Sequence, residues 1–449
     1  MKGGSDVRGR SPLIRRVWIV YAAYGDGHRS AAEAVAEAVR TLHPETDVVV
    51  EDFMERIHPR FHRLLQRIYY FALRRTPSAY RTVYTVSTPQ KLLFRDILAL
   101  VRLAGQAPLL ARLRELSPDL VISTHFLATQ ELAELRARGE LLAPLVTVVT
   151  DYAVHPFWVH PANDLYFVGS REGREILEAF GFPNTRAFAV DLPLRAQFWS
   201  ADVEGRLRFP LFRKSADRPL RLLFMGGGLG MLDSLPELLL ALDRLPFAKE
   251  YVVVAGRNAE LYRALSEYRG RLQGSLVVYG FVEEVRRLME EADLLVTKAG
   301  GLSVAEARAL GLPIFLYRPL PGHEEENAKL LEAAGVARLV RTPEELLRWV
   351  TEFAARPYRG VPDPRRLRAA LETIRIVWPY AEEHVLYGSG EAPLLDWEPD
   401  DLWGEGFSAG DERSANPFPF FRGSEEGSGN DSSCGESPSP RVPLPPGSG

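Results

Sequence analysis

Three side chains that can accept a proton follow predicted buried strands in the first half of the chain. His28 comes after the apolar run 17–23, while Asp151 and His155 come after the run 145–150. A histidine in such a place can take a proton from a hydroxyl group, because its pKa lies near neutrality. The carboxylate can be the base itself or can orient an imidazole. The residues alone do not separate the three.

The run 293–328 in the second half has the order of elements that binds a phosphate. Residues 294–297 predict a strand buried on both faces, Gly300 and Gly301 predict a turn, and 303–310 predict a helix. A strand, a glycine turn and a helix point backbone N–H groups and the positive end of the helix at a phosphate. Many α/β domains contain such a unit, so it is a weak signal alone.

A carboxylate and a polar loop complete this run. Glu306 lies inside the predicted helix, which Gly311 and Pro313 end, and the loop 319–325 follows the next predicted strand. These groups can hold a ribose and a sugar beside the phosphate.

The elements around these residues predict an α/β protein with two doubly wound, Rossmann-like domains. Apolar runs typical of buried strands alternate with helical patterns of 10–15 residues through both halves of the chain. In such sheets ligands bind at the carboxyl ends of the strands. The candidate residues above stand at those ends.

Composition is compatible with two ordinary hydrophobic cores, since 46% of the 449 residues are hydrophobic and 25% are charged. The single cysteine, Cys434, excludes an internal disulfide and a cysteine-based metal site, as expected for a reducing cytoplasm. We find no signal peptide and no run of about 18 apolar residues. We therefore expect a cytoplasmic protein, attached at most peripherally to the inner face of the cell membrane.

Charge is segregated along the chain. Between Arg56 and Arg114 twelve Lys or Arg residues accompany one acid, Asp96, whereas the stretch from Glu391 onward holds twelve acids and three Arg. A basic, aromatic-rich helical block favours an anionic membrane surface as partner. A solvated surface helix pair is the ordinary alternative, and nucleic acid is the third, without a binding module to support it.

These motifs in this order resemble the GT-B glycosyltransferases of family 28. The resemblance is carried by GDGH at 25–28, by TDYAVHPFW at 150–158, by AVDLPLRAQF at 189–198 and by the donor run 293–328. It is strongest to the monogalactosyl- and processive glucosyl-diacylglycerol synthases, with the lipid II N-acetylglucosaminyltransferase more distant. It covers about residues 15–385 and implies two domains that face each other across a cleft.

The resemblance implies where the donor binds. Leu302 and Ser303 would lie on the diphosphate, Glu306 would accept from the ribose hydroxyls, and the backbone at Phe281 and Val282 would meet uracil. The full set of expected donor-binding residues is Gly226, Gly227, Gly228, Arg257, Phe281, Val282, Gly300, Gly301, Leu302, Ser303, Glu306, His323, Glu324 and Asn327. No metal or other cofactor is expected, because helix dipoles and arginine can offset the diphosphate charge.

The acceptor side is expected in the first domain, where the family receives its lipid. The residues expected there are Gly25, Gly27, Arg63, Arg67, Tyr69, Tyr70 and Trp158. Among the candidate bases, Asp151 and His28 rank ahead of His155. The alternative for GDGH is a plain turn between a strand and a helix.

Three residues depart from the family pattern. GDGH stands where relatives more often show GGGH, and Asp191 stands where relatives carry Gly, which leaves the backbone conformation there in question. His323 replaces a sugar-contacting Gln and cannot both donate and accept as an amide does, so the choice of sugar is open. The alternative for His323 is a loop histidine in solvent.

Domain boundaries follow from the same patterns. We expect a flexible N-terminus at 1–14, an acceptor domain at 15–200, a linker at 201–219 and a UDP-sugar-binding domain at 220–358. A C-terminal helix at 359–388 would brace the first domain, and an acidic tail rich in Pro, Gly and Ser at 389–449 would be disordered.

The function implied by the resemblance is inverting transfer of a hexose, glucose or galactose, from a UDP-sugar to diacylglycerol. One alternative is transfer of N-acetylglucosamine to a polyprenyl-diphosphate acceptor. A UDP-sugar 2-epimerase-like isomerase and a non-catalytic nucleotide-sugar or lipid-binding protein are the others. The basic aromatic block disfavours the isomerase, and the presence of His28, Asp151 and Glu306 disfavours the non-catalytic protein. The oligomeric state and the number of sugars added are not indicated.

Overall fold

A computed structural model describes residues 13–57, 59, 62–64, 66, 105–203, 218–230, 232, 234–320 and 322–387. Nearly all of the expected N-terminal segment 1–14, much of the basic block and the whole tail 389–449 lie outside the described residues. The described residues belong to one compact unit.

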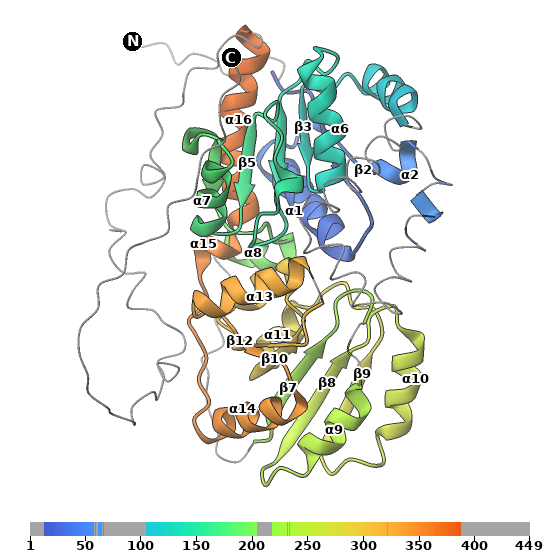
Figure 1. Cartoon of the computed structure of the whole chain (residues 1–449), viewed down its shortest axis with the longest axis vertical. Coiled ribbons are helices and arrows are strands. Elements are labelled where there is room, and N and C mark those ends of the chain that lie inside the picture. Colours follow the sequence, from blue (N-terminus) through green and yellow to red (C-terminus); the bar gives the residue numbers. More distant parts are fainter. Residues whose placement is uncertain are drawn as a thin grey trace, which may run out of the picture. The chain divides into compact units, whose positions relative to one another are not determined.

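The first half contains a six-stranded sheet in the order β2-β1-β3-β4-β5-β6, and every neighbouring pair is parallel (Figure 1). Its strands are β1 (Arg16–Tyr21), β2 (Asp47–Asp52), β3 (Leu120–Ser123), β4 (Leu145–Val148), β5 (Leu165–Val168) and β6 (Ala187–Ala189). The central strands β3, β4 and β5 are buried along their whole length. This burial explains their largely apolar sequences, since helices cover both faces of a parallel sheet.

Helices of the first half connect these strands. They are α1 (Asp26–Leu42), α2 (Phe53–Ile57), α6 (Phe126–Ala137), α7 (Arg171–Ala179) and α8 (Ala196–Val203), with 3-10 turns η1 (Pro156–Trp158) and η2 (Asn184–Arg186). In α1 the buried side chains Ala31, Val35 and Val39 recur every four residues, so one face of the helix packs on the sheet. The expected linker 201–219 begins too early, because α8 continues to Val203.

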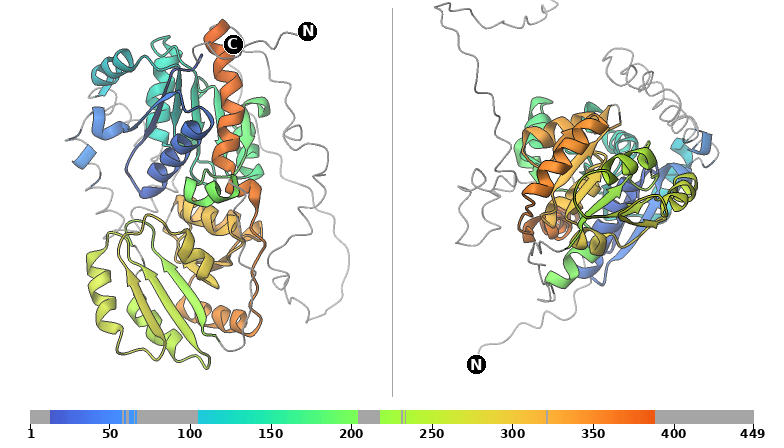
Figure 2. Two further views of the ribbon diagram at one scale, coloured as in Figure 1. Left: turned by 180° about the vertical axis from the view of Figure 1, so that it is seen from behind. Right: turned by 90° about the horizontal axis from the view of Figure 1, so that it is seen from below.

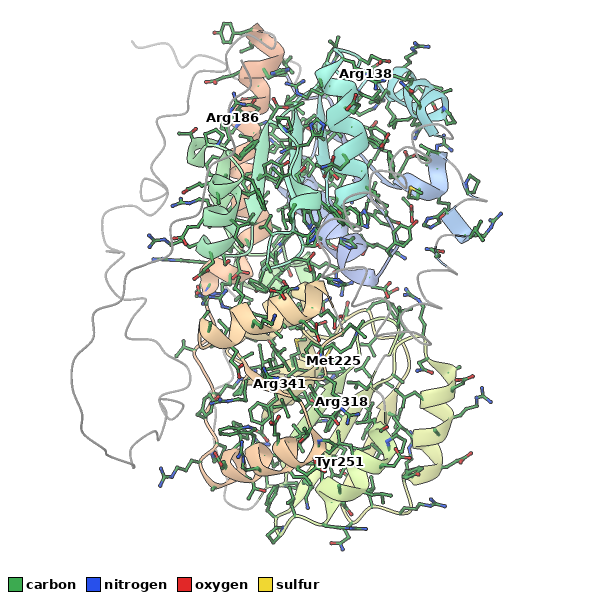
Figure 3. All side chains as sticks on the ribbon, viewed as in Figure 1. Arg138, Arg186, Met225, Tyr251, Arg318 and Arg341 are labelled. Carbon is green, nitrogen blue, oxygen red and sulfur yellow. The ribbon has the colours of Figure 1, made fainter. Side chains whose placement is uncertain are left out.

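The second half contains another six-stranded parallel sheet, in the order β12-β11-β10-β7-β8-β9. Its strands are β7 (Leu220–Met225), β8 (Lys249–Val254), β9 (Ser275–Tyr279), β10 (Leu294–Thr297), β11 (Ile314–Tyr317) and β12 (Arg338–Val340). Met225 at the end of β7 and Tyr251 in β8 are labelled in Figure 3. Its helices are α9 (Leu235–Asp243), α10 (Ala259–Tyr268), α11 (Arg286–Glu291), α12 (Gly301–Ala309), α13 (His323–Ala333), α14 (Pro343–Ala355) and α15 (Pro364–Leu367).

The last described helix, α16 (Ala369–Tyr387), packs against α1 of the first half (Figure 2). Its buried residues Ile374 and Val377 belong to the same hydrophobic cluster as β1, and the Trp378 ring stacks on His43 with centroids 3.5 Å apart. The sequence predicts one C-terminal helix at 359–388, whereas the structure has α15 and α16, which are separated at Arg368.

Asp191 joins the two halves. Its φ is 79°, in the left-handed region that glycine favours, so the backbone keeps the conformation expected of the relatives' Gly. The carboxylate accepts from the Tyr152 hydroxyl at 3.0 Å, and ion pairs of 3.2 Å join it to Arg308 of α12 and to Arg366 of α15. These bonds offset the strain that a side chain brings at this position.

Candidate active site

Both sheets place their candidate residues where the direction of the strand connections reverses. In the first sheet β1 and β3 are neighbours, and in the second β10 and β7 are neighbours. Ligands of open α/β sheets bind at such switch points, at the carboxyl ends of the strands. Gly25 and the start of α1, with His28, follow β1, and Thr124 follows β3. In the second sheet the turn 226–230 follows β7, and Gly300 follows β10.

His28 is anchored through one ring nitrogen. Its Nδ1 lies 2.9 Å from the carbonyl oxygen of Thr124 and 2.8 Å from the hydroxyl of Thr150. Because a carbonyl oxygen only accepts, Nδ1 carries the hydrogen in the neutral ring and Nε2 has the lone pair. His28 can therefore accept a proton at Nε2.

Burial lowers the pKa of His28 below its usual 6.5. The Asp151 carboxylate and the Thr124 carbonyl raise this pKa, while His323 lowers it. The net direction keeps the imidazole neutral at pH 7, so the lone pair is present where a base is needed. Asp151 would stabilise the imidazolium once the ring had taken a proton.

His155 has the opposite arrangement. It caps η1, and its Nδ1 accepts from the backbone N–H of Phe157 at 3.2 Å, so Nε2 carries the hydrogen in the neutral ring. Burial lowers the pKa of His155 to about 4. This geometry makes His155 a hydrogen-bond donor and ranks it below His28 as a base.

Asp151 is held from the other half of the chain. Its Oδ1 accepts from the side-chain amide of Asn327 at 3.1 Å, and the same amide donates to the carbonyl of Ala299 at 3.2 Å. The Asn327 carbonyl accepts from the backbone N–H of Ala153 at 2.8 Å. Asn327 is fully buried, and its amide connects the loop after β4 to α13 and to the turn after β10.

The two glycines of the turn after β10, Gly300 and Gly301, differ in the space around them. A Cβ on Gly300 would meet nothing within 4 Å, so a ligand can approach the backbone there. A Cβ on Gly301 would lie 2.1 Å from the carbonyl oxygen of Thr150, so only glycine fits between the halves. Gly300 caps α12 without a side-chain hydrogen bond. The first N–H groups of α12, among them those of Leu302 and Ser303, have no partner inside the helix and can bind an anion.

Glu306 is 6% exposed in α12, and burial raises its pKa to about 7. Arg195 opposes that rise. A carboxyl group that titrates near neutrality in a buried place is a recognised mark of a functional site.

His323 and Glu324 begin α13. Glu324 is buried and forms an ion pair of 3.0 Å with Lys298, and its other oxygen accepts from the backbone N–H of Leu320 at 2.8 Å. The pKa of Glu324 falls despite desolvation, because Lys298 and His323 favour its charged form. His323 is half-buried at the start of a helix, and its charge lowers the pKa of both His28 and His155. This placement argues against a solvent histidine.

The turns after β7 and β8 form one surface. The backbone N–H of Arg257 donates to the carbonyl of Gly228 at 2.8 Å, and its guanidinium lies 4.2 Å from the centroid of the Phe281 ring. Gly226 and Gly227 stand directly before Gly228 in the sequence, and Val282 stands directly after Phe281. The expected donor residues of these turns are thus brought together, and Arg257 carries a positive charge among them.

Three of the expected acceptor residues lie outside the described residues: Arg67, Tyr69 and Tyr70. Arg63 is exposed, and Gly25 and Gly27 flank the start of α1. Trp158 is 1% exposed and its ring centroid lies 6.1 Å from that of His28, so it packs beneath the candidate base. Trp158 therefore offers no exposed surface of its own, and its expected place on the acceptor side stays a prediction.

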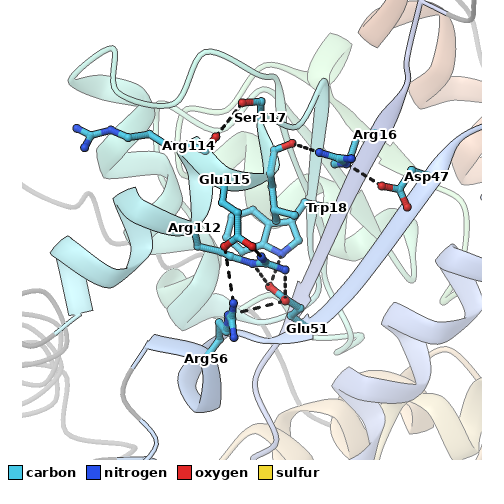
Figure 4. Close-up of polar contacts among 10 residues, drawn as sticks. Arg16, Trp18, Asp47, Glu51, Arg56, Arg112, Arg114, Glu115 and Ser117 are labelled. Atoms are coloured by element: carbon cyan, nitrogen blue, oxygen red, sulfur yellow. Dashed lines mark hydrogen bonds and ion pairs between the residues drawn. The ribbon is translucent and has the colours of Figure 1, made fainter.

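Two arginines of the basic block are neutralised by acids just outside it (Figure 4). Arg112 donates to both carboxylate oxygens of Glu51, at 2.6 and 3.1 Å, and forms an ion pair of 2.7 Å with Glu115. Arg56 lies within 4 Å of both acids, and Trp18 donates to Glu51 at 3.1 Å. This end of the block serves the packing of the first half.

Sequence reasoning missed the roles of Thr124, Thr150, Lys298 and Asp26. Thr124 and Lys298 directly follow buried strands, and Thr150 lies two residues beyond β4, so a place at the carboxyl end of a strand is the signal that could have indicated their roles. Asp26 stands out in the sequence only as a departure from GGGH, yet it pairs with Arg257. Within the described part of the chain, no helix is long and apolar enough to span a membrane. No group of three potential metal-ligating side chains occurs there either.

Comparison with known proteins agrees with the predicted family. A family model described as monogalactosyldiacylglycerol (MGDG) synthase matches residues 28–194, and one described as the glycosyltransferase family 28 C-terminal domain matches residues 222–356. The processive diacylglycerol beta-glucosyltransferase of Bacillus mycoides (strain KBAB4) is 29% identical over 331 residues, which are 74% of this chain and 83% of that protein.

Solved structures share the fold. The glycotransferase of kitacinnamycin superposes with a TM-score of 0.53 at 16% identity, covering 82% of this chain and 99% of that one. UDP-N-acetylglucosamine 2-epimerase from Rickettsia bellii superposes with 0.50 at 14% identity, covering 83% and 98%. The predicted two-domain α/β GT-B fold is confirmed. The fold alone does not choose between a transferase and an epimerase.

Proposed function

Because this chain belongs to glycosyltransferase family 28, through the matches of both its halves, we propose that it transfers a hexose from a UDP-sugar to the hydroxyl of diacylglycerol. The curated relatives are diacylglycerol glucosyltransferases, which disfavours both the polyprenyl-diphosphate alternative and the epimerase. The sugar, glucose or galactose, is set by contacts near His323 and is left to experiment.

One observation carries the proposal: the candidate base His28, at the start of α1, lies next to the anion-binding N–H groups at the start of α12. A Cβ on Gly27 would lie 3.8 Å from the Leu302 side chain, so the start of α1, with His28, lies against the start of α12. A proton acceptor and free helical N–H groups thus stand side by side. Glycosyl transfer needs this pair of groups.

The reaction follows from this placement. Nε2 of His28 takes the proton of the acceptor hydroxyl while its oxygen attacks C1 of the hexose from the face opposite the leaving group. The bond between C1 and the β-phosphate oxygen breaks, UDP leaves with the electron pair, and the configuration at C1 inverts. The imidazolium is stabilised by Asp151, which raises the pKa of His28.

Charge on the departing diphosphate is offset by groups of the chain. The first N–H groups of α12 face it, and the guanidinium of Arg257 lies among the donor residues of the turns after β7 and β8. Glu306 would accept from the ribose hydroxyls in its ionised form. These groups supply the positive charge that a divalent cation provides in other transferases, so we propose a metal-free reaction.

We further propose that the enzyme works on an anionic membrane at the inner face of the cell membrane. The basic block between 56 and 114 supports this, and Arg63 and Arg114 are exposed among its described members. Arg67, Tyr69 and Tyr70 belong to the same proposed surface.

The test is a transfer assay with purified protein, labelled UDP-glucose or UDP-galactose in turn, and diacylglycerol in anionic vesicles. We expect a glycolipid product, with kcat reduced at least about a hundredfold in His28→Gln. His155→Asn preserves a capping side chain and should retain most activity. No lipid product with either donor, although UDP binds, would discard diacylglycerol as acceptor. Equal loss in both histidine variants would reject the assignment of the base.

A further inference from the structure

We propose that Asp26 occupies the anion position at Arg257 in the ligand-free enzyme and is displaced from it by the diphosphate of the donor. Asp26 is thus a positioning residue that sets the affinity for the donor. The proposal rests on the proposed function, because it takes the donor to be a nucleoside diphosphate sugar.

The first evidence is an ion pair between the two halves of the chain. Nη1 of Arg257, in the turn after β8, donates to Oδ1 of Asp26 at 2.6 Å and also contacts Oδ2. Asp26 is the first residue of α1. The arginine is fixed from two further sides, by its backbone bond to Gly228 and by the Phe281 ring beneath its guanidinium. Its charge is therefore held at one place.

The second evidence is the position of the carboxylate on the turn after β7. A Cβ on Gly228 would lie 1.5 Å from Oδ2 of Asp26 and 2.4 Å from its Cγ. The carboxylate therefore takes the space that a side chain at this position would fill. It lies directly on the backbone that the donor would have to approach.

The groups around Asp26 are those assigned to the donor. Gly228, Arg257 and Phe281 are all expected to bind UDP-sugar, and each either contacts Asp26 or contacts its partner Arg257. A carboxylate and a diphosphate repel each other, and they compete for one guanidinium. Because the diphosphate has more charge and more acceptor oxygens, it can replace the carboxylate at a cost in affinity.

Two alternative roles for Asp26 predict different results. An acid in the first turn of α1 is stabilised by the helix dipole, but this role would leave UDP affinity unchanged on neutralisation. If Asp26 instead aligned Arg257 for the donor, neutralisation would weaken UDP binding. Of the three roles, only displacement of Asp26 by the diphosphate predicts that neutralising Asp26 makes UDP bind more tightly.

The first experiment titrates UDP into the full chain by calorimetry. We expect Asp26→Asn to bind UDP about five-fold more tightly than the unaltered protein, since a partly exposed ion pair contributes up to about that factor. Asp26→Glu keeps the charge and serves as the matched control, with an affinity within about two-fold of the unaltered protein. Equal or weaker binding by Asp26→Asn overturns the proposal.

The second experiment is a double-mutant cycle on urea unfolding with Asp26→Asn, Arg257→Gln and the double variant. We expect a coupling between the two residues in the free protein that disappears at saturating UDP. A merely structural ion pair would keep its coupling when UDP is bound, and that result would overturn displacement.

The two proposals fail separately. If the unaltered protein neither binds UDP nor makes glycolipid, the proposed function fails and the inference falls with it. If the protein makes glycolipid and binds UDP while Asp26→Asn has no tighter affinity, the proposed function stands and only the role of Asp26 is rejected.

Discussion

The side-chain amide of Asn327 donates to the carboxylate of Asp151 at 3.1 Å, across 176 residues of sequence. One residue in the second half thereby fixes the carboxylate that faces the candidate base in the first. The same amide accepts from the backbone of Ala153, so α13 holds both ends of a short loop. The position of Asp151 therefore depends on how the two halves pack together.

Replacing Asn327 by Leu should remove the hydrogen bonds that join α13 to the loop after β4. The change leaves a backbone N–H and a carbonyl without their partner in a buried place, which costs about 1–3 kcal/mol of unfolding free energy. We expect kcat to fall as well, because Asp151 loses its orientation. Urea unfolding and steady-state kinetics measure the two effects. Lys329→Ala, on an exposed face of α13, is the control and should change neither. Unchanged stability in Asn327→Leu would contradict the role given to this amide.

Much of the site is predictable because its residues obey rules local to the sequence. Glycine turns after apolar runs locate Gly228 and Gly300, and the residue type of His28 identifies a base. What separates His28 from His155 is a carbonyl acceptor in one case and a backbone N–H in the other. Those partners are set by tertiary packing, which no spacing rule contains.

Long-range pairs are what the sequence could not predict. Asp26 and Arg257 stand 231 residues apart, and no periodicity relates them. The burial of Trp158 could not be predicted either, because the sequence around an aromatic residue does not distinguish a core position from a surface position. The bond between Arg112 and Glu51 also escapes prediction, because 61 residues separate them in the sequence.

Glu306 should make donor binding depend on pH near neutrality. Its carboxyl, with a pKa of about 7, must be ionised to accept from ribose hydroxyls, so KM for the UDP-sugar should rise as pH falls from 8 to 6. Glu306→Gln should have a KM that is high and independent of pH over this range. A parallel pH dependence in the variant would show that another group is responsible.

The carboxyl group of Glu306 should also lower the stability of the ligand-free protein above neutral pH. Since folding raises the pKa of Glu306 from 4.5 to about 7, the folded state holds the proton more tightly. Its contribution to stability is therefore full below pH 4.5 and is lost as pH rises to about 7. Urea unfolding at pH 8 should find Glu306→Gln more stable than the unaltered protein by up to about 3 kcal/mol. At pH 4.5 the difference should vanish.

Two substitutions at Asp191 should separate the effect of backbone strain on stability from the effect of the side-chain bonds. Asp191→Ala keeps the strained φ and removes the acceptor of Tyr152, Arg308 and Arg366, so we expect a loss of about 2–3 kcal/mol in unfolding free energy. Asp191→Gly loses the same bonds but relieves strain worth about 1 kcal/mol. Thermal or urea unfolding should thus rank the unaltered protein first, the Gly variant second and the Ala variant last. A Gly variant less stable than the Ala variant would contradict the account of strain.

Membrane binding should depend on the arginines of the proposed membrane surface and not on arginines of the block that are paired with acids. We expect Arg63→Glu combined with Arg67→Glu to reduce the affinity for anionic vesicles at least about thirty-fold in a co-sedimentation assay, since each basic residue near such a surface contributes about 1 kcal/mol. The effect should shrink as salt rises. Arg112→Gln is the matched control: Glu51 and Glu115 already neutralise this arginine, so the variant should lose stability but keep its vesicle affinity. Reduced vesicle binding in Arg112→Gln equal to that of the double variant would mean that loss of fold, and not loss of surface charge, explains the result.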